Sequence, residues 1–162
     1  MKAMDTLPSF FHYPNASLRG ADENDIPFLV KLINEAYSYQ DEAKGSTRTN
    51  PEHLRKRMTK TDFYVIERAN EIVGCIYLEP RELSLHFGLL TLIPRLRGKG
   101  IAQAVMTAIE AHAQHHNYPT IELDYMSLAP WLRPYYEKYG FIATGEIQEW
   151  GSIDLIRMKK QF

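Results

Sequence analysis

Apolar residues recur at helical spacing in four stretches of the chain, and each stretch predicts a helix with one buried face. The helices are expected from Asn24 or Asp25 to about Tyr37, from Asn50-Pro51 onward, from Ile101 to about His116, and from Trp131 to Tyr139. In the second helix, Leu54 and Met58 form the buried face. Arg55, Lys56 and Arg57 form its basic outer face.

Runs rich in β-branched and aromatic residues lie between these helices and predict strands. The expected strands cover residues 17–19, 63–67, 72–78, 83–92, 120–125, 141–150 and 153–158. Ala69-Asn70-Glu71 is typical of a tight hairpin connection between the second and third strands. The order β-α-α-β-β-β-α-β-α-β-β indicates a mixed α/β domain, with strands joined by hairpins as well as by crossovers.

Two stretches lack a clear periodicity. Residues 1–16 contain prolines and the aromatic cluster Phe10, Phe11 and Tyr13, which predicts an irregular N-terminal arm whose aromatic rings dock on the domain of residues 17–162. Residues 38–50 are polar and have little to bury, so a loop is expected there.

Length and composition narrow the class of protein. The 162 residues, 44% of them apolar and 24% charged, correspond to about one globular domain. Nineteen basic against twenty acidic residues give a net charge of −1, which argues against a nucleic-acid partner. Cys75 is the single cysteine, and no apolar run approaches the roughly 20 residues that span a bilayer. With no signal-peptide pattern at Met1, we expect a cytoplasmic protein without a membrane partner.

The stretch most informative about chemistry runs from Leu90 to Ala102, where a strand leads through a basic, glycine-rich turn into a helix. Such a turn directs several backbone N–H groups at one point, beside the positive end of the helix dipole. Gly98 and Gly100 allow a close approach that a side chain would block. The turn suits a diphosphate, although it is also interpretable as an ordinary strand-to-helix connection. It matches neither a Walker loop nor the three-glycine dinucleotide fingerprint.

Two motifs in the chain resemble motifs of the GNAT superfamily of acetyl-CoA-dependent N-acetyltransferases. The family signature is Gln or Arg, two residues, Gly, one residue, and then Gly or Ala. It fits residues 95–100 and residues 97–102 in overlapping registers. The sequence Tyr-Tyr-Glu-Lys-Tyr-Gly-Phe at residues 135–141 is similar to the family's Tyr-Glu-Lys-x-Gly-Phe segment. The resemblance covers residues 17–160. It implies a GNAT-like mixed sheet of about seven strands with helices on both faces, in a single domain.

The resemblance also implies roles for particular residues. Leu90, Thr91 and Leu92 would hold the pantetheine arm of acetyl-CoA, chiefly through the backbone of Leu90 and Leu92, where two parallel strands separate. Tyr136 would protonate the leaving thiolate. The chain departs from the family at Ala129, where many members have an Asn that contacts the cofactor. The turn would hold the pyrophosphate through Arg97, Gly98, Lys99, Gly100, Ile101, Ala102 and Gln103.

An amine attacks a thioester only as the free base, and neutralising a lysine-like amine of pKa about 10.4 costs about 4.6 kcal/mol at pH 7. His86 is the first candidate base, because histidine titrates near neutral pH. It lies two alternations before Leu90, on the same strand face, where some family members place a glutamate base. A hydrogen-bonded structural histidine is the alternative. Glu79, Glu122 and Asp124 are further candidates, each equally interpretable as a surface carboxylate.

Other side chains have both a functional and a structural interpretation. His112, His115 and His116 have a helical spacing that could bind a metal, but histidines near a helix C-terminus are favoured by the dipole in any case, and no metal is expected. Arg48 could meet a carboxylate of the acceptor or be solvated. Aromatic residues that could line an acceptor pocket, or pack in the core, are Tyr37, Tyr39, Tyr125, Trp131 and Trp150.

These patterns predict an N-acetyltransferase that takes acetyl-CoA as co-substrate and transfers the acetyl group directly to a primary amine of a small molecule or a protein. The alternatives are a non-catalytic acyl-CoA-binding sensor or partner subunit, which needs no acid at Tyr136, and a nucleotide-phosphate binder, which the missing Lys-Ser/Thr disfavours. The acceptor, the acyl chain length and the oligomeric state, a homodimer included, are not specified by the sequence.

Overall fold

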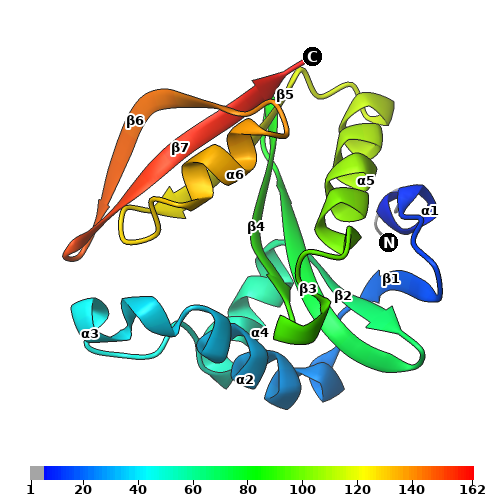
Figure 1. Ribbon diagram of the computed structural model, residues 1–162, viewed down its shortest axis with the longest axis horizontal. Coiled ribbons are helices and arrows are strands. Elements are labelled where there is room, and N and C mark those ends of the chain that lie inside the picture. Colours follow the sequence, from blue (N-terminus) through cyan, green and yellow to red (C-terminus); the bar gives the residue numbers. More distant parts are fainter. Residues whose placement is uncertain (1–5) are drawn as a thin grey trace.

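The computed structural model describes residues 6–162, whose strands form a seven-stranded sheet (Figure 1). Its strands are β1 (Ala16–Gly20), β2 (Asp62–Arg68), β3 (Glu71–Pro80), β4 (Ser84–Leu92), β5 (Thr120–Met126), β6 (Ile142–Trp150) and β7 (Ile153–Gln161). Their order across the sheet is β1-β2-β3-β4-β5-β7-β6. Neighbouring strands are antiparallel except for β4 and β5, which are parallel. The predicted mixed sheet of about seven strands is confirmed.

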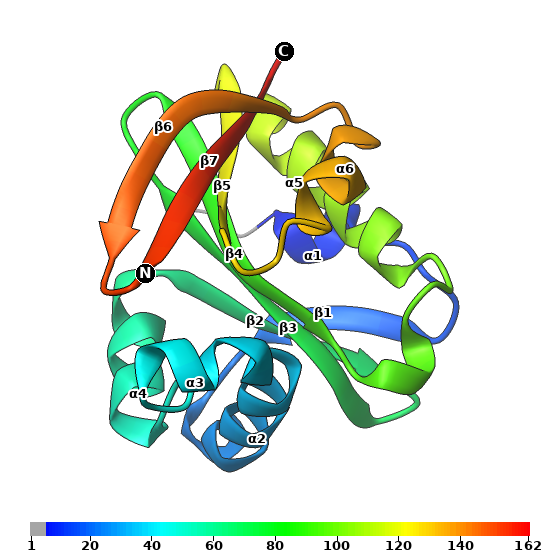
Figure 2. The ribbon, with the colours of Figure 1, turned by 60° about the vertical axis from the view of Figure 1, so that its left-hand side comes forward.

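Helices cover both faces of this sheet, as predicted (Figure 2). The main ones are α2 (Ile26–Ala36), α4 (Pro51–Lys60), α5 (Ile101–His115) and α6 (Leu132–Glu137); α1 (Leu7–Phe10), α3 (Asp41–Lys44) and the 3₁₀ turns η1 (Glu23–Asp25), η2 (Ser38–Gln40) and η3 (Pro94–Leu96) are shorter. One apolar cluster joins α1 and α5 to the sheet, and a second joins α2 and α4 to its other face. None of the helices in residues 6–162 combines the length and the apolar character needed to cross a membrane.

The segment before β1 is more regular than the irregular arm that the sequence predicts. Residues 7–10 form α1, and Leu7 and Phe11 are buried in the cluster around α5. The Tyr13 hydroxyl donates a hydrogen bond to the carbonyl of Lys99 (2.7 Å), so the aromatic residues do dock on the domain. The prediction of irregular backbone was wrong for residues 7–10, because contacts with α5 hold a helical turn that is too short to show a period of its own.

Residues 38–50 also differ from the expected loop. They contain η2 and α3, and Gln40 is buried, with its Nε2 donating to the carbonyl of Ser46 (3.0 Å). The Asn34 side chain in α2 accepts from the backbone N–H of Thr49 (2.8 Å) and donates to the carbonyl of the same residue (3.1 Å). Polar hydrogen bonds order this segment, and a hydrophobic pattern does not reveal them.

Strands β4 and β5 pair only over residues 84–86 and 120–122, and then separate. Near this point β4 also bulges, since its register with β3 shifts and Leu89 has a φ of +53°. Phe87 belongs to the cluster around α5, whereas Leu89 belongs to the cluster around α2. Leu90 packs with the cluster of Phe87, while the ring of His86 contacts Tyr77 in the other cluster. The prediction that His86 and Leu90 lie on the same face of the strand is therefore wrong, because the bulge breaks the alternation of side chains between them.

Candidate active site

A pocket of about 410 Å³ opens where β4 and β5 separate. Its lining includes both residues predicted to be catalytic, His86 and Tyr136, together with Leu90 from the predicted cofactor strand. Four of the aromatic residues expected at an acceptor site also line it: Tyr37, Tyr39, Tyr125 and Trp150. Trp131 does not line it; 56% of its surface is exposed, and its ring contacts that of Tyr39.

Tyr136 reaches the pocket from α6, which is followed by a turn at Gly140 with a φ of +93°. The tyrosine ring is buried edge-to-face against Phe87 and Phe141. Burial raises the pKa of Tyr136 well above its usual value of about 10, and neighbouring tyrosines add to the effect. Its hydroxyl makes no hydrogen bond with another described residue, so a protonated phenol faces the pocket with its donor free.

His86 is buried on β4, with 5% of its surface exposed. Its Nε2 lies 3.4 Å from Oδ2 of Asp124 on β5, and within the described chain neither ring nitrogen makes a well-formed hydrogen bond. Burial by itself would raise the pKa of Asp124, but contacts with His86 and Arg157 outweigh it and lower the pKa to about 2. Asp124 is therefore an anion at neutral pH, beside one nitrogen of the imidazole, and Nδ1 is left without a partner.

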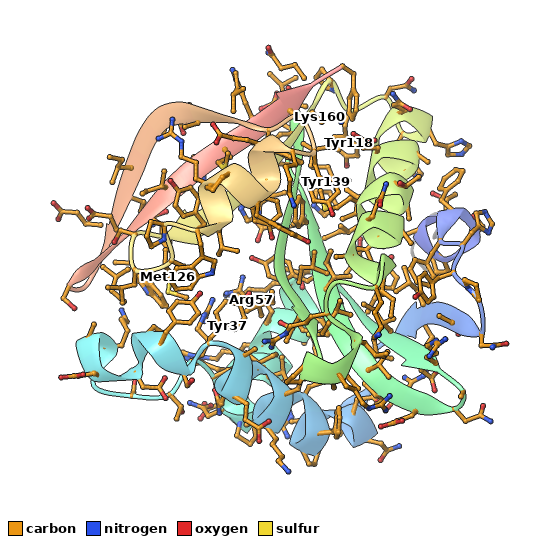
Figure 3. All side chains as sticks on the ribbon, viewed as in Figure 1. Tyr37, Arg57, Tyr118, Met126, Tyr139 and Lys160 are labelled. Atoms are coloured by element: carbon orange, nitrogen blue, oxygen red, sulfur yellow. The ribbon has the colours of Figure 1, made fainter. Side chains whose placement is uncertain are left out.

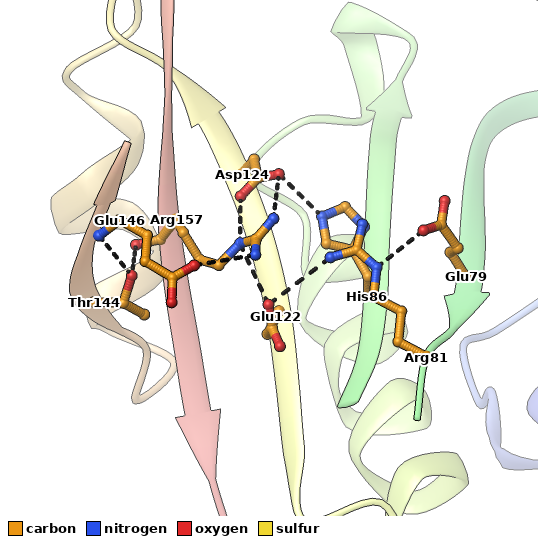
Figure 4. A network of polar contacts seen from close by, with 8 residues as sticks. All are labelled: Glu79, Arg81, His86, Glu122, Asp124, Thr144, Glu146 and Arg157. Carbon is orange, nitrogen blue, oxygen red and sulfur yellow. Dashed lines mark hydrogen bonds and ion pairs between the residues drawn. The ribbon is translucent and has the colours of Figure 1, made fainter. Parts of the chain in front are cut away.

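The other candidate bases are held by arginines (Figure 4). Arg81 contacts Glu79 (2.9 Å) and lies 3.9 Å from Glu122. Arg157 contacts Glu122 (3.3 Å) and Asp124 (3.0 Å). These carboxylates form one charge-compensated network. Of the candidate bases, His86 is the one that no arginine contacts, and its Nδ1 has no hydrogen-bond partner within the described residues.

The glycine-rich turn forms a cradle of unused donors between η3 and α5. Gly98 and Gly100 have φ values of +73° and +90°, a region that residues with side chains rarely adopt. Over residues 98–103, part of the described chain, no backbone N–H meets a backbone acceptor; the first helical bond of α5 runs from the N–H of Ala104 to the carbonyl of Gly100 (3.1 Å). The predicted residues Gly98, Lys99, Gly100, Ile101, Ala102 and Gln103 supply these donors.

The charges around the cradle and the unpaired edge of β4 complete this arrangement. The Arg97 Nε lies 3.3 Å from the carbonyl oxygen of Leu92. Arg95 instead forms an ion pair with Glu71 (2.7 Å). On the side toward β3, Thr91 and Leu92 pair with Cys75 and Gly74. On the side toward β5 the strand is unpaired beyond His86. A free strand edge that leads to a cluster of free N–H groups fits a ligand with an amide-bearing arm and a diphosphate, as acetyl-CoA has.

The three histidines at the C-terminal end of α5, His112, His115 and the C-cap residue His116, contact the N-terminal segment. Thr6 Oγ1 lies 2.7 Å from Nδ1 of His112 and 3.1 Å from Nε2 of His116, and the ring of His115 contacts Phe10. Residues 6–162 contain no group of three metal-ligating side chains that could hold an ion. Ala129, the departure from the family pattern, is fully buried after β5.

Arg57 and Tyr77 are among the pocket-lining residues that sequence reasoning missed. The pattern places Arg57 on the outer face of its helix, but its guanidinium lies 4.7 Å from the ring centre of Tyr77. The signal was present, because position 57 follows the buried Leu54 by three residues and so shares its side of the helix. A Cβ at Gly88 would lie 2.4 Å from the Tyr77 hydroxyl oxygen, so a side chain there would force the tyrosine ring to move.

Comparison with known families matches residues 33–162 to the Acetyltransferase (GNAT) domain. Since this match spans most of the chain, the protein belongs to the GNAT acetyltransferase family, and the resemblance seen in the sequence is confirmed. No curated protein sequence gives a significant match.

Several solved structures share the fold. A spermidine N-acetyltransferase from Vibrio cholerae, in complex with CoA and spermine, is 20% identical over 92% of this chain and 96% of that one, with a TM-score of 0.70. A GNAT family acetyltransferase from Elizabethkingia anophelis with acetyl-CoA bound is 16% identical over 93% and 100%, with a TM-score of 0.68. A ribosomal-protein-alanine N-acetyltransferase from Brucella melitensis is 18% identical over 90% and 99%, with a TM-score of 0.66. At these identities the likeness establishes the fold.

Proposed function

We propose that the protein is an N-acetyltransferase that transfers an acetyl group from acetyl-CoA directly to a primary amine of a small molecule or a protein. The observation that carries the proposal is the meeting of His86 and Tyr136 in one pocket, at the point where β4 and β5 separate. Family membership and the acetyl-CoA-bound neighbour support acetyl-CoA as the co-substrate. Its diphosphate would bind residues 97–103 and its pantetheine arm would lie along residues 90–92.

When bound, acetyl-CoA supplies an activated acetyl group as a thioester. His86 would accept the proton of the acceptor amine at Nδ1, because the anionic Asp124 lies beside Nε2 and favours the tautomer protonated there. A partner next to one ring nitrogen thus orients the other as the base.

Tyr136 would hold a proton at its hydroxyl oxygen for the departing thiolate. Because burial raises its pKa, the phenol stays protonated at neutral pH and can donate a hydrogen bond to a developing negative charge on sulfur. The two residues would then perform the two proton movements that an acetyl transfer to an amine requires, one away from nitrogen and one toward sulfur.

The test is a screen of primary amines with acetyl-CoA, read by the release of free CoA thiol. The expected result is thiol release with at least one class of amine, accompanied by a mass increase of one acetyl group on the acceptor. Binding of acetyl-CoA without thiol release for any amine would contradict the proposal and favour the non-catalytic acyl-CoA-binding module instead.

A further inference from the structure

One end of the pocket carries two guanidinium groups from different segments. Arg48 precedes α4, and its Cζ lies 5.0 Å from the ring centre of Trp150 and 5.7 Å from that of Tyr37. Arg57 enters from α4 and lies over Tyr77. Figure 3 shows Arg57 and Tyr37 directed toward the same space between the α2–α4 layer and the end of β5. Both arginines line the pocket.

Neither guanidinium has an acidic partner. Within residues 6–162, no carboxylate oxygen lies within 4.0 Å of Arg48 or Arg57, and the Nε of Arg48 is buried without a hydrogen-bond acceptor. The rest of the pocket differs, because Arg81 there is balanced by Glu79, and Asp124 is balanced by Arg157. The unbalanced positive charge is therefore confined to the end of the pocket at Arg48 and Arg57.

The ring contacts of Arg48 leave one of its donors unsatisfied. Trp150 and Tyr37 supply aromatic faces but no acceptor for the buried Nε, and a buried donor of a charged group is costly when it has no hydrogen-bond acceptor. Burial, together with the nearby positive charge of Arg57, lowers the pKa of Arg48. An anion bound between the two arginines would compensate the charge of both guanidinium groups and remove the repulsion.

The segment that carries Arg48 is also held in place before any ligand binds. Asn34 holds both backbone groups of Thr49, the residue after Arg48. Lys44 donates to the carbonyl of Trp150 (3.2 Å), and Ser152 donates to the carbonyl of Ala43 (2.7 Å), which ties the β6–β7 hairpin to the segment that carries Arg48. A preorganised donor loses less conformational freedom when it binds its ligand.

We infer that the acceptor amine carries a carboxylate, which Arg48 and Arg57 bind while the amine lies toward His86. This inference rests on the proposed function and names its substrate class. The planar guanidinium donates two parallel hydrogen bonds to a carboxylate, which fits the fork geometry of Arg48. A polyamine such as the spermine bound in the Vibrio cholerae neighbour brings only positive charge and would be repelled at this end of the pocket.

The test compares matched acceptors and matched variants. The acceptors are a panel of amino acids, their carboxamides, their aminophosphonate analogues and spermidine, each assayed with acetyl-CoA by thiol release. The variants are Arg48→Gln, Arg57→Gln and, as a control on the same helix as Arg57, Arg55→Gln, whose side chain pairs with Glu23 outside the pocket.

We expect an amino acid to be acetylated at least 10-fold more efficiently than its carboxamide. Arg48→Gln lowers kcat/KM for the amino acid by about 10- to 100-fold, the range for removal of a charged hydrogen bond, and changes the value for the carboxamide by less than about 2-fold. Arg55→Gln leaves both values unchanged. Equal rates with acid and amide, a preference for spermidine, or a preference for the phosphonate would overturn the assignment of a carboxylate.

A failure of the proposed function is distinguishable from a failure of this inference. If no amine releases thiol, binding of the same acid and amide is measured by calorimetry on the CoA-saturated parent and on Arg48→Gln. Selective binding of the acid that Arg48→Gln weakens supports the carboxylate site in a protein without the proposed activity. Binding that Arg48→Gln does not change, or no binding of the acid, contradicts it.

Discussion

Nε2 of His86 on β4 lies 3.4 Å from Oδ2 of Asp124 on the neighbouring strand β5. His86 is the last residue of β4 that pairs with β5, and its partner in that pairing is Glu122. Asp124 follows two positions later on the same face of β5, so its carboxylate reaches the imidazole just as the strands begin to separate. The contact therefore lies at the point where the two strands separate, and it fixes the orientation of the proposed base.

Replacing His86 with Gln removes the proposed base but keeps a polar side chain. We expect kcat at pH 7 to fall by about 10²-fold, the lower end of the range for general acid–base catalysis. The deficit should shrink as pH rises toward the pKa of the acceptor amine, because more of the amine is then already the free base. His115→Gln, remote from the pocket, is the control. A deficit of the same size at every pH would show that His86 only positions other groups.

Replacing Tyr136 with Phe removes the hydroxyl and keeps the buried ring. Turnover should fall by about 10²-fold or more, while the affinity for CoA stays near the parent value, because in the proposed mechanism the phenol acts on the leaving thiolate. Tyr135→Phe and Tyr139→Phe should lower turnover far less, since neither side chain lines the pocket. Steady-state kinetics and CoA titrations of the three variants measure this. Unchanged turnover in Tyr136→Phe would remove the acid role.

Replacing Gly100 with Asp places a negative charge in the donor cradle at a φ of +90°. Acetyl-CoA at a hundredfold excess over its Kd should stabilise the parent protein by about 2.7 kcal/mol, and this stabilisation should be absent in the variant. Gly145→Asp is a matched control, because Gly145 has a φ of +89°, a Cβ there would have no neighbour within 4 Å, and the residue lies on β6 away from the cradle. Thermal melts of both variants and the parent, with and without acetyl-CoA, measure this stabilisation. A Gly100→Asp protein that acetyl-CoA still stabilises would place the diphosphate elsewhere.

Replacing Asp124 with Asn tests the charge network by its pH dependence. The folded pKa of about 2 lies below the unfolded value of 3.8, so the ionised carboxylate stabilises the fold above about pH 4, and this contribution is lost as pH falls toward 2. Asp124→Asn should lower the free energy of unfolding at pH 7 by about 1–2 kcal/mol, allowing for partial exposure. In urea titrations the difference from the parent should narrow below pH 4. The exposed Asp154→Asn serves as control; a difference for Asp124→Asn that does not change with pH would argue against the network.

Much of the fold follows from local pattern. The hairpin at Ala69-Asn70 was predicted from turn residues, and both residues adopt positive φ values of 52° and 64°. The four main helices and the seven strands were found within a few residues of their ends, since apolar periodicity depends on which face an element buries. The short helix α1 was missed because one turn is too short to show a period, and because the burial of Leu7 depends on residues far away in the sequence.

The sequence by itself determined which candidate site residues lie close together along the chain. Residues 97–103 were proposed as a diphosphate cradle from local pattern, because a turn with positive φ needs glycine and a helix N-terminus supplies donors wherever it occurs. Tyr136 was proposed from the resemblance of its segment to the family. Only the tertiary structure decided how distant side chains combine. The bulge at Leu89 separates the faces of His86 and Leu90, the register of β4 with β5 places Asp124 beside His86, and the packing of α4 turns Arg57 into the pocket. Register and packing arise from contacts between segments far apart in sequence, and periodicity within one segment carries no information about them.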